Sequence, residues 1–190
     1  MARLRSSVQA LYQVFGCYGL RPHVAGCDHC VSPEDHERLQ SQRLRELTGT
    51  SLERHVCKAV TTWGTVEDCK HFLPRLLELL AFDDHWSVEP EIVIGKLRAA
   101  DWRSWRRAEQ EPIEGYLVAL WQTVLASFPS SLGLNIDVCL CSIGRAVDAL
   151  APFLKFWSHE RSVSSLRHLA DYLQENRWTL LKKGRLSNAF

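Results

Sequence analysis

The chain has 190 residues, of which 46% are hydrophobic and 24% are charged, and its formal net charge is +1. This length permits one domain with a hydrophobic core, and the composition excludes an intrinsically disordered chain. A charge near zero excludes a general attraction to nucleic acid or anionic membranes, although the segment from Arg161 onward is locally basic.

No stretch reaches the roughly 18 to 20 uninterrupted apolar residues of a membrane span, so we expect no membrane partner. The seven cysteines are an odd number and occur without a secretory signal, which argues against a disulfide framework. Both features favour a cytoplasmic protein.

Apolar residues recur at helical spacing through most of the chain, beginning with Leu4, Val8, Leu11 and Phe15. No segment combines two-residue alternation with hairpin turns. We therefore predict an all-α fold in one domain, residues 1–190, with a Cys- and His-containing loop at 17–32. The expected helices, in chain order, are 3–16, 33–47, 51–63, 65–82, 88–100, 103–128, 135–158 and 161–176.

Several of these helices have chemical start signals. Ser32 can accept a hydrogen bond from the first turn, and Pro33 suits the first helical position. Ser51 is the expected cap of the next helix, and Thr65 with Asp68 is a variant of the capping box.

The prolines suggest a repeat. Pro74, Pro112 and Pro152 are spaced 38 and 40 residues apart, close to the ~40 to 47 residue period of HEAT-type helical repeats. We therefore predict stacked antiparallel helix pairs that form a short HEAT-like solenoid. A compact helical bundle is the alternative.

The stretch HVAGCDHCVSPEDH, residues 23–36, carries a CxxC pair. Cys27 and Cys30 on one turn can supply two ligands of a tetrahedral zinc site, and His23 and His36 are the candidates for the other two. The same pair could instead form a redox dithiol or a loop with packed thiols.

A second cluster is DWRSWRR at 101–107. Trp102, Arg103, Trp105, Arg106 and Arg107 could bind a partner, because tryptophan and arginine dominate many interfaces. In the opposite interpretation the two tryptophans belong to the core and the arginines face water.

Known catalytic signatures do not occur in the sequence. It has no GxxxxGK[ST] phosphate loop, no GxGxxG after a strand, no HExxH helix and no GxSxG elbow. We assign no catalytic residue and expect a protein that is not an enzyme.

The strings GCDHC at 26–30, TTWGTVEDCKHFLPRLLELLA at 61–81 and GKLRAADWRSW at 95–105 are distinctive. Through them the chain resembles a group of bacterial helical proteins of unknown function with an N-terminal CxxC and a TWG…KHFLPRLLELL segment. The resemblance implies a bacterial, cytoplasmic protein and supplies no activity. Relatives tend to carry an aromatic residue in place of Cys69, which speaks against Cys69 as a metal ligand.

Three functions follow as hypotheses. The first is a non-enzymatic helical protein-binding module, an adaptor or an immunity-type partner, whose partner is another protein. The second is a zinc-binding or thiol-redox protein centred on the CxxC at 27–30. The third and weakest is nucleic-acid binding by the 103–107 arginines or by the basic C-terminal end.

Overall fold

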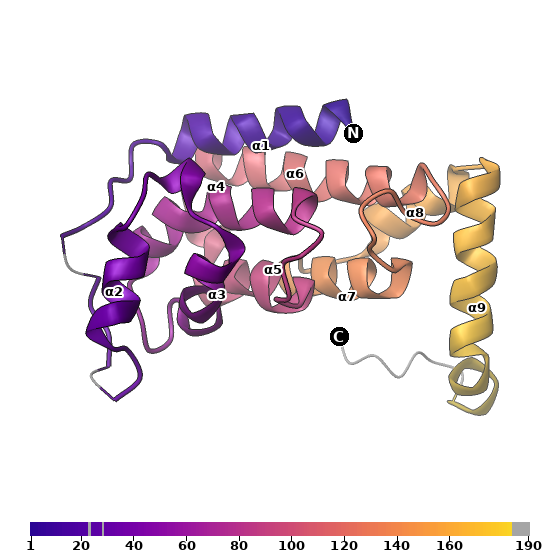
Figure 1. The fold of residues 1–190 in the computed structure, drawn as a ribbon. Coiled ribbons are helices and arrows are strands. Elements are labelled where there is room, and N and C mark those ends of the chain that lie inside the picture. Colours follow the sequence, from indigo (N-terminus) through magenta and orange to yellow (C-terminus); the bar gives the residue numbers. More distant parts are fainter. Residues whose placement is uncertain (23, 28, 184–190) are drawn as a thin grey trace.

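The computed structural model describes residues 1–22, 24–27 and 29–183, and all regular structure in these ranges is helical (Figure 1). Extended pairing among the described residues is limited to isolated bridges of Trp63 with Gly26 and with Ala59. The predicted all-α class is therefore confirmed.

The helices lie in the following order along the chain. They are α1 (Ala2–Phe15), α2 (Pro33–Gln40), η1 (Leu44–Glu46), α3 (Gly49–Lys58), α4 (Val66–Phe82), α5 (Pro90–Ala99), η2 (Trp102–Ser104), α6 (Arg107–Leu125), α7 (Ile136–Ala146), α8 (Ala151–His159) and α9 (Val163–Lys183), where η marks a 3₁₀ turn. Among the described residues, no helix is both long and apolar enough to cross a bilayer.

Three predicted helices are interrupted in the structure. The 33–47 helix stops at Gln40 and resumes only as η1, and the 103–128 helix is preceded by η2 and an extended residue, Trp105. The 135–158 helix is divided into α7 and α8, because Pro152 has no N–H and occupies the first turn of α8. Helix α9 continues to Lys183, beyond the predicted end at residue 176.

The capping predictions are mostly confirmed. The Asp35 amide donates to Ser32 Oγ over 3.4 Å and the Ser32 amide to Asp35 Oδ2 over 3.1 Å. The Thr65 amide donates to Asp68 Oδ2 over 2.8 Å. The predicted cap Ser51 was wrong: Thr48 caps α3, and the Ser51 amide donates to Thr48 Oγ1 over 3.2 Å.

The three prolines do not mark one repeated position. Pro74 and Pro112 lie inside α4 and α6, whereas Pro152 lies in the first turn of α8. A helix interior that contains proline lacks one backbone hydrogen bond, and the packing of the helix face compensates for this loss.

Helix α1 packs against α4 and α6, and α5 packs against α7 (Figure 1). Helices α2 and α3 cover one end of this body, and α9 stands across the opposite end. Contact between the first helix and one that begins more than ninety residues later is typical of a compact bundle, since a solenoid repeat contacts only its neighbours. One hydrophobic core runs from Leu4 to Tyr172.

Candidate functional site

The tryptophans of the 102–107 cluster are part of the core. Trp102 is 1% exposed and Trp105 is 7% exposed. The indole N–H of Trp102 donates to the Ala146 carbonyl over 2.8 Å, and that of Trp105 to the Ala100 carbonyl over 3.0 Å. Of the two interpretations of this cluster, the burial and these hydrogen bonds support the one in which both tryptophans belong to the core.

The arginines of the same cluster are ion-paired. Arg103 Nη1 lies 2.6 Å from Glu114, Arg107 Nη1 lies 3.1 Å from the same carboxylate, and Arg106 Nη2 lies 3.4 Å from Glu109. Neighbouring carboxylates neutralise these cations, so the three arginines form no unbalanced positive surface.

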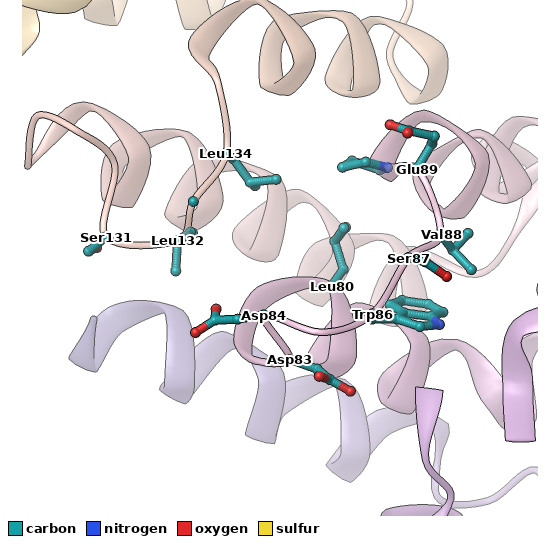
Figure 2. A pocket seen from close by; sticks show the side chains of 12 residues that line it. Leu80, Asp83, Asp84, Trp86, Ser87, Val88, Glu89, Ser131, Leu132 and Leu134 are labelled. Atoms are coloured by element: carbon teal, nitrogen blue, oxygen red, sulfur yellow. The ribbon is translucent and has the colours of Figure 1, made fainter. Parts of the chain in front are cut away.

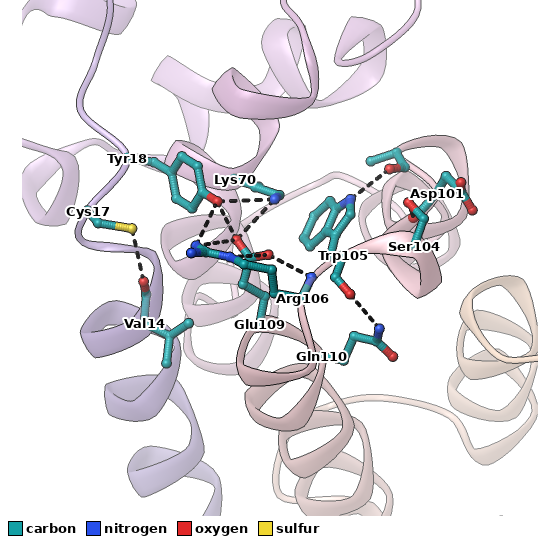
Figure 3. A network of polar contacts seen from close by, with 11 residues as sticks. Val14, Cys17, Tyr18, Lys70, Asp101, Ser104, Trp105, Arg106, Glu109 and Gln110 are labelled. Carbon is teal, nitrogen blue, oxygen red and sulfur yellow. Dashed lines mark hydrogen bonds and ion pairs between the residues drawn. The ribbon is translucent and has the colours of Figure 1, made fainter.

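Glu109 is the centre of a polar network (Figure 3). The network joins helix α4, helix α6 and the loop that follows α1. The Glu109 carboxylate is 1% exposed and accepts hydrogen bonds from the Tyr18 hydroxyl, from Lys70 Nζ over 3.0 Å and from the Arg106 amide over 3.0 Å. Burial alone would raise the pKa of Glu109, but these hydrogen bonds outweigh it and lower the pKa to about 2. Lys70 Nζ also lies 4.5 Å from the Trp105 ring centroid. The network joins three elements, and its carboxylate is ionised at neutral pH.

The CxxC pair lies on a hydrogen-bonded turn. The amides of Cys30 and Val31 donate to the Cys27 carbonyl over 2.7 and 3.0 Å, and the Cys27 amide donates to the Thr62 carbonyl over 2.9 Å. The Cys30 carbonyl accepts from Arg54 over 3.2 Å. The turn therefore brings the two cysteines together. Its backbone is hydrogen-bonded to Arg54 of α3 and to Thr62, which follows α3.

Of the two other predicted ligands of the zinc site, His36 contacts Trp63, which forms a bridge with Gly26 beside Cys27. The His36 ring lies edge-on to Trp63, with ring centroids 5.5 Å apart, and His23 lies outside the described residues. Within the described ranges, no three His, Cys, Asp or Glu side chains are placed to hold a metal ion. The set Cys27, Cys30, His23 and His36 stays a prediction.

A further buried histidine, His55 of α3, contacts Trp63 and was not predicted as a functional residue. His55 is fully buried, with its ring centroid 5.0 Å from that of Trp63 and 4.5 Å from that of Phe72. Neither of its ring nitrogens hydrogen-bonds to any described residue. Burial lowers the pKa of His55 to about 3, so the ring is neutral at physiological pH. The spacing of Leu52, His55, Val56 and Ala59 on one helical face could have indicated this burial.

A pocket of about 350 Å³ lies between the α4–α5 and α6–α7 loops (Figure 2). Leu80, Val88, Leu132 and Leu134 supply apolar surface to its wall. Its charged lining residues are all acids, namely Asp83, Asp84 and Glu89. This charge attracts cations in general, but the lining selects no particular ligand.

Helix α9 presents its polar face to the body of the protein. Ser165, His168, Tyr172 and Asn176 are between 1% and 8% exposed. His168 Nε2 lies 2.9 Å from the Ser127 carbonyl, and the Trp157 indole donates to the Ser165 carbonyl over 3.2 Å; both contacts hold α9 in this orientation.

Beside this buried face, about a quarter turn around the helix, α9 carries an apolar face exposed to solvent. We call Leu166, Leu169 and Leu173 the α9 apolar face; they are 47%, 39% and 47% exposed. Their spacing of three and four residues places them in one row. Their exposure was not predicted, because leucines at helical spacing usually mark the side of a helix that faces the core.

Near the C-terminal end of α9, on a different side of the helix from this row, an exposed tryptophan is accompanied by two cations. Trp178 is 61% exposed; the Arg177 guanidinium lies 5.0 Å from its ring centroid and Lys182 Nζ lies 5.7 Å from it. Within the part of the chain that the structure describes, neither cation lies within ion-pair distance of a carboxylate. We call these three residues the cation–tryptophan cluster.

The chain was also compared with known proteins. No protein-family model, no curated protein and no solved structure matches it. A functional assignment therefore depends on the geometry of the surfaces described above.

Proposed function

We propose that this chain is a non-enzymatic protein-binding module, an adaptor or immunity-type partner of a bacterial cytoplasm, that docks another protein on the α9 apolar face. The observation that carries the proposal is the orientation of α9, whose polar face is buried while Leu166, Leu169 and Leu173 are exposed. Contiguous apolar rows on a folded protein mark interaction surfaces more often than isolated exposed leucines do.

The energetics favour docking at this surface. Burying the exposed part of each of the three leucines contributes about 1 kcal/mol. Rotating α9 to bury them in its own body would expose Tyr172 and break the contacts of His168 with Ser127 and of Trp157 with Ser165. A partner can cover the leucines without that loss.

The reactive side chains of the core support a binding role over a catalytic one. Burial raises the pKa of the Cys69 thiol and of the Cys139 thiol to about 12. With His55 held neutral, these groups supply neither a thiolate nor an exchangeable proton at neutral pH.

The proposal is tested by comparing variants in the native host. Tagged wild-type protein is expected to co-purify with a stoichiometric partner, Leu166→Ser with Leu173→Ser is expected to lose it, and the matched α9 variant Glu175→Gln is expected to keep it. Calorimetry with the purified partner should reproduce this order, and circular dichroism should show that all variants stay folded. A partner that the leucine variant retains, or the absence of any stoichiometric partner under several growth conditions, would contradict the proposal.

A second candidate function is zinc binding at the CxxC turn. It is supported by the hydrogen-bonded turn that brings Cys27 and Cys30 together. Metal analysis of the purified protein should find about one zinc per chain, which Cys27→Ser with Cys30→Ser should abolish together with a fall in melting temperature. Protein that lacks zinc, and a double variant that melts like the parent, would eliminate this candidate.

Thiol-redox chemistry at the same turn would instead show as a reversible change in free thiol content without metal. Nucleic-acid binding by Arg103, Arg106 and Arg107 is poorly supported, because all three are paired with carboxylates.

A further inference from the structure

The CxxC turn presents two thiols at a spacing that one ion can bridge. The Cys30 amide donates to the Cys27 carbonyl over 2.7 Å, and the Val31 amide donates to the same oxygen over 3.0 Å. A turn of this kind holds the Cα atoms of its first and fourth residues within roughly 7 Å of each other. Residues three apart on a helical turn also share one side, so the two sulfurs can reach a common ligand.

The backbone of this turn is fixed by the segment between α3 and α4. The Cys27 amide donates to the Thr62 carbonyl over 2.9 Å, and Gly26 forms a bridge with Trp63. Trp63 is 2% exposed and belongs to the hydrophobic core. Side chains on a fixed backbone lose less conformational freedom when a ligand binds, so the turn is prepared for an ion.

The thiols of this turn are also accessible. Cys27 is exposed and Cys30 is half-buried. The other cysteines of the chain are either buried or have no second cysteine within three residues in the sequence; they are Cys17, Cys57, Cys69, Cys139 and Cys141, of which the last three are buried. An accessible pair at this spacing therefore occurs once in the sequence.

Two cations reach the same turn from α3. Arg54 Nη2 donates to the Cys30 carbonyl over 3.2 Å, and Lys58 Nζ donates to the same carbonyl. Arg54 also forms an ion pair with Asp35 at 3.2 Å, whereas Lys58 has no ion pair with any described residue. A monovalent ion held by two thiolates has one net negative charge, which the Lys58 ammonium is placed to balance.

We infer that the CxxC turn binds Cu(I) through the sulfurs of Cys27 and Cys30. Soft thiolates select this soft ion, and two of them in a line form a complete ligand set for it. On binding, both thiols release their protons to solvent and two S–Cu bonds form, with no change in oxidation state. The inference concerns the turn of the second candidate function and does not depend on the α9 apolar face.

Other uses of the pair fit the described residues less well. A structural zinc ion takes four ligands, and within the described ranges no third His, Cys, Asp or Glu joins the pair in a metal-binding group. The His36 ring instead packs edge-on against Trp63, with the ring centroids 5.5 Å apart. A disulfide between the two cysteines would be neutral and would gain nothing from the Lys58 charge.

The test is an anaerobic titration of the full-length protein with Cu(I), kept reduced by ascorbate, in competition with the chromophoric chelator bicinchoninate. The protein is expected to remove about one Cu(I) per chain from the chelator. X-ray absorption of the loaded protein should show two sulfur ligands and no nitrogen ligand. An equal concentration of zinc should leave the bound copper in place.

Matched variants identify the ligands. Cys27→Ser with Cys30→Ser should abolish binding, whereas Cys17→Ser with Cys57→Ser, which removes the other two exposed thiols, should keep it.

The contribution of the cation is measured separately. Lys58→Gln should weaken the affinity by about threefold, because it removes the charge that balances the complex. Lys155→Gln, the same change at an exposed lysine of α8, should leave the affinity unchanged. Circular dichroism checks that the variants are folded, and the X-ray absorption of the wild-type protein decides the ligands if the double serine variant is not.

Several results would overturn the inference. Failure to take Cu(I) from the chelator would do so, as would copper retained by a folded Cys27→Ser, Cys30→Ser variant. A nitrogen ligand that His23→Ala or His36→Ala removes would overturn the two-sulfur set. Zinc binding without Cu(I) binding would overturn it and leave the second candidate function standing, and a disulfide in place of the copper complex would assign the turn to thiol-redox chemistry. The docking proposal fails separately, if the leucine variant keeps the native partner.

Discussion

The chain combines tryptophan with arginine in two places, residues 102–107 and the C-terminal half of α9, and the two places differ in what their side chains contact. In the first, Trp102 and Trp105 donate to backbone carbonyls inside the core, and the arginines pair with glutamates of α6. In the second, Trp178 is exposed and Arg177 contacts its ring. The same residue types therefore stabilise the fold at one place and remain exposed to solvent at the other.

Truncating Trp102 in the first region and Trp178 in the second should give the largest difference in the free energy of unfolding. Trp102→Ala should lower the free energy of unfolding by about 3 to 5 kcal/mol, because it leaves a cavity and an unpaired Ala146 carbonyl. Trp178→Ala should change it by less than about 0.5 kcal/mol, since its ring faces solvent. Urea unfolding measures both values, and similar losses for the two variants would remove the distinction between the regions.

Removing a buried and an exposed carboxylate should give the next largest difference in the free energy of unfolding. Glu109→Gln should cost about 3 kcal/mol, because Lys70 would keep its charge in a nearly buried position without an ionic partner. Glu111→Gln, at an exposed carboxylate one helical turn from Arg107, should cost less than about 0.5 kcal/mol. Equal urea midpoints for the two variants would show that the network of Figure 3 contributes little.

Acid should destabilise the body of the protein through His55. Its pKa is about 3 in the folded state against 6.5 for an unperturbed histidine, so the unfolded state binds more protons between these values. The free energy of unfolding therefore has its full value above pH 6.5. It falls as the pH decreases and is lower by about 2 kcal/mol at pH 5. His55→Phe should remove this dependence between pH 5 and 6.5. The same slope in that variant would assign the effect to another group.

The α9 apolar face should contribute least to folding. Leu166→Ser with Leu173→Ser is expected to change the free energy of unfolding by less than about 1 kcal/mol, since both side chains are about half exposed. Partner binding should nevertheless be lost. A loss of several kcal/mol in thermal or urea unfolding would mean that these leucines support the fold instead.

Helix positions were predictable from local signals. Ser32 with Asp35 and Thr65 with Asp68 start their helices as expected, because capping depends on residues within one turn. The division of the predicted 135–158 helix was missed, since apolar spacing continues across residues 147–150 and periodicity alone does not detect a break. Pro152 was the available signal, because proline favours a first turn over a helix interior.

Which side chains of the candidate sites face solvent was less predictable than the positions of the helices. The residues at 102–107 left open whether Trp102 and Trp105 face a partner or the core, and the position of the segment around residue 146, which contacts Trp102, decided for the core. The α9 apolar face went unnoticed for the converse reason, because a row of leucines normally faces a core. The ligand set of the CxxC turn also depends on how distant segments approach it.

The sequence by itself determined that the chain is helical, since spacing and caps act over a few residues. It also determined that α9 has one apolar side and one side with Ser165, His168, Tyr172 and Asn176. Only the tertiary structure decided which side faces the body. That choice depends on Ser127 and Trp157, whose carbonyl and indole contact His168 and Ser165 across loops and helices that local periodicity does not encode.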